Sequence, residues 1–190
     1  MPSVSIRKSV LTLTAMAASA LALSACGNAE DKAKSDADRP NAEGLTAAEI
    51  AARATTEQVS MTPAEREEFR QGMVEMLDQT GENRAEGHIR VPGVEDQIVA
   101  MQPLQDHKFT VPMTAGKLYL IFAVCDGDCK VVDLTLLDSA GAEIKTDTDS
   151  GDFPVLDFTP TTSGSFSVRM TMTECDLAPC YAGARVYQQG

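Results

Sequence analysis

Gly164-Ser165-Phe166-Ser167-Val168-Arg169-Met170-Thr171-Met172-Thr173 is a stretch in which apolar and polar side chains alternate from end to end. Successive side chains of a β-strand point to opposite faces of the sheet, so one face of this segment is apolar and the other is polar. The pattern predicts a strand over residues 164–174 with one face buried and one in water. The buried face would carry Phe166, Val168, Met170 and Met172.

A second segment, residues 117–125, is apolar on both faces. Leu118, Leu120, Phe122 and Val124 alternate there with Tyr119, Ile121 and Ala123. We therefore expect this strand to be central in its sheet. Further strand-like runs, separated by turn residues, lie near 97–101, 107–112, 131–138, 142–146, 153–159 and 181–187. About eight short strands predict a mainly β fold, an antiparallel β-sandwich or jelly roll over residues 94–190.

A short α-helical segment is predicted ahead of the β-sandwich, over residues 45–86. Thr46-Ala47-Ala48-Glu49 is a capping-box pattern, and its helix is expected to run to about Val59. Thr62-Pro63-Ala64-Glu65 is a second one, with proline at the first helical position, and its helix is expected to run to about Gln79 and stop at Gly81. Four apolar residues share one face of this helix: Phe69, Met73, Met76 and Leu77. That face either packs on the β domain or docks a partner protein.

The order of motifs within the β domain resembles a known family. The motifs are Ala115-Gly116-Lys117-Leu118-Tyr119, Val132-Asp133-Leu134-Thr135-Leu136, Asp138-Ser139-Ala140-Gly141, Thr146-Asp147, Leu156-Asp157-Phe158 and Gly164-Ser165-Phe166. Together they resemble the bacterial pre-peptidase C-terminal domain, over about residues 97–190, with Phe166 in place of the more usual Tyr. The resemblance implies a small β-sandwich of secreted and envelope proteins, an accessory module without catalytic residues.

The amino-terminal segment resembles the leader of a bacterial lipoprotein. Arg7 and Lys8 precede an apolar run over residues 10–23, which is short for a membrane span, and Leu23-Ser24-Ala25-Cys26-Gly27 resembles a lipobox. The resemblance implies a signal peptide over residues 1–25 and lipid, including palmitate, on Cys26. Gly27, where Asp would favour inner-membrane retention, implies the outer membrane. An ordinary secretory signal with an incidental cysteine is the alternative.

The segment after the lipobox is polar, and the chain as a whole is acidic. Residues 26–44 are small, charged and almost free of large apolar side chains, which predicts a disordered tether after the lipidated cysteine. The whole chain has 16 Lys and Arg against 28 Asp and Glu, a formal net charge of −12. Nucleic acids and anionic lipid surfaces attract basic patches, so the charge argues against both as binding partners.

Four cysteines remain besides Cys26. An even number in an exported chain predicts disulfides. Three pairings are possible, and we favour the local ones, because each would join the end of one strand to the start of the next: Cys125 with Cys129, and Cys175 with Cys180. A four-cysteine zinc site and a redox pair are the alternatives.

Two acidic loops could bind calcium, which prefers several hard oxygen ligands. The candidate ligands are Asp126, Asp128, Asp133, Asp147, Asp149 and Asp152. The spacing is not that of an EF-hand, and some relatives of the resembled sandwich bind calcium. Solvated, turn-forming loops are the other interpretation.

No signature of an enzyme occurs: the sequence lacks Gly-x-Ser-x-Gly, His-Glu-x-x-His and a phosphate-binding glycine loop. His88 and His107 are its two histidines. We therefore expect a membrane-anchored lipoprotein of the cell envelope, on the outer membrane or in the periplasm. It would be a non-catalytic binding or assembly module whose partner is another envelope protein. A calcium-dependent ligand- or glycan-binding module is the alternative, with an undetected envelope enzyme third.

Overall fold

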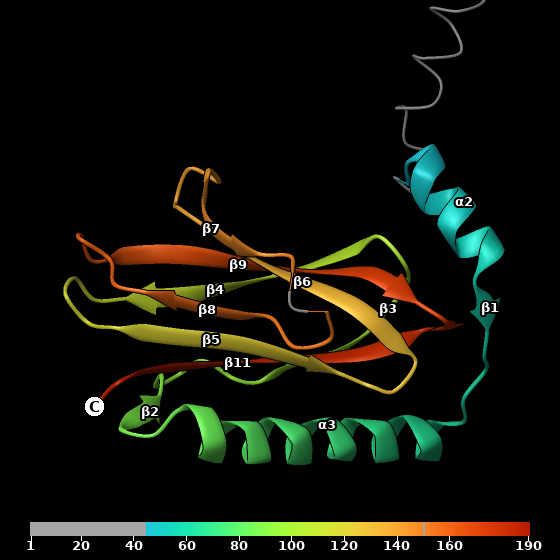
Figure 1. The fold of residues 1–190 in the computed structure, drawn as a ribbon, viewed down its shortest axis with the longest axis horizontal. Coiled ribbons are helices and arrows are strands. Elements are labelled where there is room, and N and C mark those ends of the chain that lie inside the picture. Colours follow the sequence, from blue (N-terminus) through green and yellow to red (C-terminus); the bar gives the residue numbers. More distant parts are fainter. Residues whose placement is uncertain (1–44, 150) are drawn as a thin grey trace, which may run out of the picture.

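The computed structural model describes residues 45–149 and 151–190. The signal peptide, Cys26 and the tether predicted over residues 1–44 lie outside the described residues. Figure 1 shows two sheets face to face, with one long helix along the outside of one of them. The elements in chain order are α2 (Ala47–Thr55), β1 (Glu57–Gln58), α3 (Pro63–Arg84), β2 (His88–Arg90), β3 (Gln97–Met101), β4 (Gln105–Met113), β5 (Tyr119–Cys125), β6 (Cys129–Leu137), β7 (Glu143–Asp147), β8 (Val155–Phe158), β9 (Gly164–Cys175), β10 (Leu177–Ala178) and β11 (Cys180–Gln189).

The strands form an open antiparallel sandwich, which confirms the predicted fold class. One sheet has the order β2-β11-β5-β8, with β3 also paired to β11, and the other has the order β4-β9-β6-β7. Every pair within these two sheets is antiparallel, whereas the short β1 and β10 form a separate parallel pair. Among residues 45–149 and 151–190, no helix combines the length and apolarity needed to cross a membrane.

The core lies between the two sheets. Val168, Met170 and Met172 of β9 are fully buried there, as the alternation predicts, and pack with Ile121 and Leu134 from β5 and β6. Strand β5 lies between β11 and β8, which confirms its central position. Its other face belongs to a second cluster with α3, so this sheet is covered on both sides.

All eight predicted strands are present, with ends displaced by at most two residues. Both capping boxes are also present: Thr46 bonds Glu49, and Thr62 bonds Glu65. Both predicted helix ends are wrong. The first helix stops at Thr55 because the chain then pairs with β10, where the N–H of Val59 donates to the carbonyl of Ala178 at 2.8 Å.

The second helix passes through Gly81 and ends at Arg84. Gly81 is buried inside the helix, and a Cβ built there would collide with the hydroxyl of Tyr187 on β11. The glycine therefore allows α3 to approach the sheet closely and does not terminate the helix.

Candidate functional site

Helix α3 buries only one edge of its apolar face. Met73 and Leu77 are buried against the sheet, which confirms that this face packs on the β domain. Phe69 and Met76, on the other edge of the face, are each 38% exposed. Large apolar side chains left in water next to one another are typical of an interaction surface. The second interpretation, docking of a partner, therefore stays a prediction for this edge.

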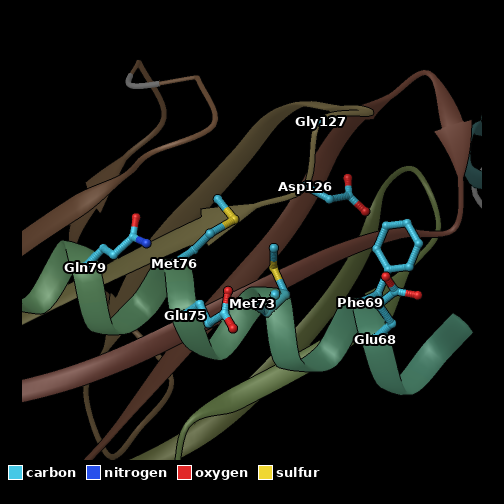
Figure 2. A pocket seen from close by; sticks show the side chains of 9 residues that line it. Glu68, Phe69, Met73, Glu75, Met76, Gln79, Asp126 and Gly127 are labelled. Carbon is cyan, nitrogen blue, oxygen red and sulfur yellow. The ribbon is translucent and has the colours of Figure 1, made fainter. Parts of the chain in front are cut away.

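A groove of about 520 Å³ lies between α3 and the β5–β6 turn. Figure 2 shows the helix forming one wall and the turn that carries Asp126 and Gly127 forming the other. The lining residues from the helix are Glu68, Phe69, Gly72, Met73, Glu75, Met76 and Gln79. The lining from the helix therefore combines apolar side chains with two carboxylates.

Gly72 keeps this groove open. It lies three residues after Phe69 and four before Met76, so all three are on one side of the helix. A Cβ built at Gly72 meets no atom within 4 Å. The missing side chain therefore leaves space that the protein itself does not fill.

The groove continues toward the amino-terminal end of α3. An adjoining hollow of about 200 Å³ shares Phe69 and Asp126 with the first. The ring of Phe69 stacks on Tyr181 of β11, with ring centroids 5.3 Å apart. The further lining residues are Val59, Ser60, Met61, Glu65, Asp128, Leu177 and Pro179. We call the residues that line these two hollows the α3 groove.

Asp126 fixes the turn opposite the helix. Its Oδ2 accepts a hydrogen bond from the N–H of Tyr181 at 2.7 Å, and its Oδ1 accepts one from the N–H of Cys129 at 3.2 Å. Burial raises the pKa of this carboxyl, although the backbone hydrogen bonds act in the opposite direction. A disulfide between Cys125 and Cys129 closes the same turn. The turn that forms this wall of the groove is therefore fixed by a disulfide and by two hydrogen bonds to Asp126.

The second disulfide joins Cys175 to Cys180, so both local pairings are confirmed. With all four sulfurs in disulfides, none is left as a thiolate ligand for the alternative zinc site. Leu177 and Pro179 lie inside the second loop and also line the α3 groove. Each disulfide thus constrains a segment that borders the groove.

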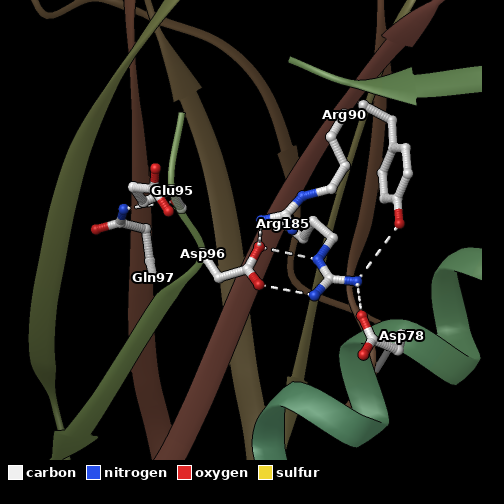
Figure 3. Close-up of polar contacts among 7 residues, drawn as sticks. Asp78, Arg90, Glu95, Asp96, Gln97 and Arg185 are labelled. Atoms are coloured by element: carbon white, nitrogen blue, oxygen red, sulfur yellow. Dashed lines mark hydrogen bonds and ion pairs between the residues drawn. The ribbon is translucent and has the colours of Figure 1, made fainter. Parts of the chain in front are cut away.

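Arg185 ties α3 to the sheet. Figure 3 shows its guanidinium between Asp96, which precedes β3, and Asp78 of the helix. Its side chain is only 3% exposed. Burial lowers the pKa of Arg185, but hydrogen bonds to Asp96, Asp78 and Tyr187 outweigh this and raise it above its ordinary value. The network keeps the helical wall of the groove in place.

Sequence reasoning missed this network. Its one signal is that Arg185 interrupts an apolar run in residues 180–187, where an unpaired charge would be costly. The pairing partners lie 89 and 107 positions earlier in the chain, so local patterns do not reveal them.

The predicted calcium ligands do not form one cluster. Asp126 bonds backbone N–H groups beside α3, and Asp128 borders the groove. Asp133 lies on β6, where its Oδ2 accepts from the hydroxyl of Thr173 at 2.7 Å. Asp147 accepts from the N–H groups of Asp149 and Val155. Asp152 is exposed. Within the described part of the chain, no three or more His, Cys, Asp or Glu side chains are placed to hold a metal ion. Calcium binding stays an untested alternative to solvated, turn-forming loops.

No family model and no curated protein matches this chain. Among solved structures, a de novo designed double-stranded β-helix is similar at 14% identity and a TM-score of 0.29, over 50% of this chain and 99% of its own. An arabinose-bound α-L-arabinofuranosidase is similar at 9% identity and a TM-score of 0.28, over 54% of this chain and 23% of its own. At these scores neither similarity bears on function.

Proposed function

We propose that this protein is a lipid-anchored, non-catalytic module of the bacterial cell envelope that binds another protein through the α3 groove. The observation that carries the proposal is the exposed apolar edge of α3, where Phe69 and Met76 flank the open space at Gly72. Partner-binding surfaces place such apolar residues at their centre, with polar groups around them.

Rigidity of the groove supports a binding role. Its helical wall is held by Arg185, and its opposite wall is held by the Cys125–Cys129 disulfide and by the hydrogen bonds of Asp126. A surface that is already ordered loses little conformational entropy when a partner binds. A preformed groove therefore favours recognition of a specific partner.

The anchoring part of the proposal rests on the sequence of residues 1–44. The lipobox at Leu23-Ser24-Ala25-Cys26 would place two or three acyl chains on Cys26, and more than one chain gives stable membrane attachment. A flexible segment of the length of residues 27–44 would average roughly 23 Å end to end, enough to hold the domain away from the bilayer. The resemblance to the pre-peptidase C-terminal domain supports an accessory role for the sandwich.

Cross-linking in bacterial cells tests the binding role. A photoreactive amino acid would replace Met76 in the full chain, and in a control it would replace Val74. The two residues are 38% and 37% exposed on the same helix, but only Met76 lines the groove. We expect one discrete protein adduct from position 76 and none from position 74. Equal adducts from both positions, or none from either, would overturn the proposed binding surface.

Palmitate labelling tests the anchor independently. We expect radioactive palmitate to enter the wild-type chain and the membrane fraction to hold it. The Cys26→Ser variant should take up no label. A variant that still labels would show that Cys26 is not the lipidated residue.

A further inference from the structure

The ionisable side chains of the α3 groove all carry the same sign. They are Glu65, Glu68, Glu75, Asp126 and Asp128, and neither hollow is lined by a Lys, Arg or His. Arg66 lines a hollow that adjoins the groove beyond Met61, so the acidic section ends there. An apolar centre surrounded by carboxylates complements a surface with apolar residues flanked by positive charge.

The acidic side chains lie on both walls. Glu68 and Glu75 are seven residues apart on α3 and follow the helix axis, while Asp126 and Asp128 belong to the turn opposite them. Figure 2 shows the turn that carries Asp126 across from the helix that carries Glu68 and Glu75. An occupant would therefore meet negative charge on both flanks.

The backbone of the helical wall indicates what conformation the occupant has. The N–H and C=O groups inside α3 are bonded within the helix, so this wall offers no open sheet edge to an extended strand. The backbone groups of an occupant that face α3 find no bonding partner on the helix, and a helical occupant bonds these groups internally. Residues 68–79 span about 17 Å along α3, a length that matches one face of about three turns of a second helix.

The apolar part of the groove suits an amphipathic helix. Met61, Met73 and Met76 line it together with Phe69. Methionine side chains are flexible and polarisable, and they adapt to apolar partners of different shape. Helices that bind such grooves use apolar residues spaced at i, i+3, i+4 and i+7.

We propose that the α3 groove binds a basic amphipathic helix of a partner protein, whose apolar face contacts Phe69 and Met76 and whose Lys or Arg side chains meet the surrounding carboxylates. This inference rests on the proposed function and names the chemistry of the partner. A second copy of the chain and an anionic membrane are disfavoured, because both would bring negative charge against the acidic groove.

Synthetic peptides test this inference. The probe is a labelled peptide of roughly 14 residues, composed of Leu at i, i+3, i+4 and i+7 spacing and Lys elsewhere, with blocked ends. One control peptide has Glu in place of every Lys, and another has the same composition in scrambled order. The protein is the mature chain, residues 26–190 with Cys26→Ser, so that no detergent is needed. Fluorescence anisotropy gives the affinities, and we expect the Lys peptide to bind at least about tenfold more tightly than either control.

Two charge-reversed variants separate the groove from general attraction to an acidic protein. Glu68→Lys with Glu75→Lys reverses the groove, whereas Glu82→Lys with Glu174→Lys makes the same change in net charge at exposed positions outside it. We expect the first pair to weaken binding of the Lys peptide about tenfold and the second by less than about threefold. Circular dichroism would check that both variants stay folded.

The outcomes distinguish this inference from the proposed function. Equal losses in the two double variants, or tighter binding of the Glu peptide, would overturn the basic-helix inference. If the peptide experiment fails in this way but the cross-link from position 76 still forms in cells, the groove binds a partner whose chemistry is not that of a basic helix. If the Lys peptide binds in the groove but no cross-link forms, the proposed function fails and the chemistry of the groove stands.

Discussion

Arg185 and Asp96 form a two-point ion pair, with Nε 2.9 Å from Oδ1 and Nη2 2.7 Å from Oδ2. The remaining nitrogen, Nη1, donates to Asp78 of α3 at 2.7 Å. The pair therefore orients a guanidinium that reaches the helix on its other side. Because α3 forms one wall of the α3 groove, the geometry of the groove depends on a charge buried behind it.

Removal of Arg185 should destabilise the protein more than removal of Asp78. Arg185→Ala removes the two hydrogen bonds that Asp96 accepts from the buried guanidinium, while Arg90, 2.6 Å away, still pairs with Asp96, so we expect the free energy of unfolding to fall by about 3 kcal/mol. Asp78 is 57% exposed, so Asp78→Ala should cost about 1 kcal/mol or less. Urea unfolding measures both. Equal costs for the two variants would show that the buried Arg185–Asp96 pair contributes no more to stability than the exposed contact of Arg185 with Asp78.

The same substitution at two glycines of α3 should have opposite effects. Gly72→Ala adds a methyl group in open space and removes backbone freedom, so it should stabilise the protein by about 0.5–1 kcal/mol. Gly81→Ala places a Cβ against the hydroxyl of Tyr187, so the helix must move and stability should fall by about 1–3 kcal/mol. Thermal unfolding with matched urea titrations would measure the change in stability of each variant. A stabilised Gly81→Ala variant would contradict the close approach of α3 to β11.

The pKa of Asp126 should lie above its ordinary value in the folded protein. Burial is the main cause, and the nearby carboxylate of Asp128 adds to it. The folded state therefore binds more protons than the unfolded state between the ordinary pKa and the raised one. The contribution of this carboxyl to the free energy of unfolding consequently decreases as the pH rises through that window. Carbon-13 NMR titration measures the midpoint, and a value at or below that of an unfolded chain would contradict the prediction.

Calcium should have little effect on this protein. The hypothesis of a calcium site predicts heat on titration with millimolar calcium and a lower melting temperature after chelation. We expect neither, because the carboxylates of Asp126 and Asp147 already accept backbone hydrogen bonds. Titration calorimetry with calcium, and with magnesium as the control, measures the heat of binding and tests this expectation. Heat that is specific to calcium and is lost in Asp147→Asn would revive the calcium-dependent alternative.

Features encoded over a few neighbouring residues could be predicted from the sequence. The alternation around Met170 located β9 and its buried face, and the capping boxes at Thr46 and Thr62 located both helix starts. Each of these signals depends on spacing within one turn or one strand. The local disulfides were predictable for the same reason.

Features that depend on distant contacts could not be predicted. Gly81 looks like a helix stop until Tyr187 is placed above it, and Val59 looks helical until β10 offers a backbone partner. The apolar face of α3 was visible, but only the packing of the helix on β5 and β11 decides that Met73 is buried while Met76 stays exposed. The groove therefore arises from tertiary packing, although the sequence did indicate the apolar helix face that forms one of its walls.

The claim that the α3 groove is the binding surface is tested most directly by filling it. Gly72→Leu would place a side chain in the open space between Phe69 and Met76, and Gln71→Leu would add the same side chain beside it, at an exposed position that does not line the groove. Each would be combined with the photoreactive residue at position 76 in cells. We predict that Gly72→Leu reduces the yield of the adduct by at least about tenfold while Gln71→Leu leaves it unchanged. An adduct formed at full yield in the Gly72→Leu protein would contradict binding in this groove.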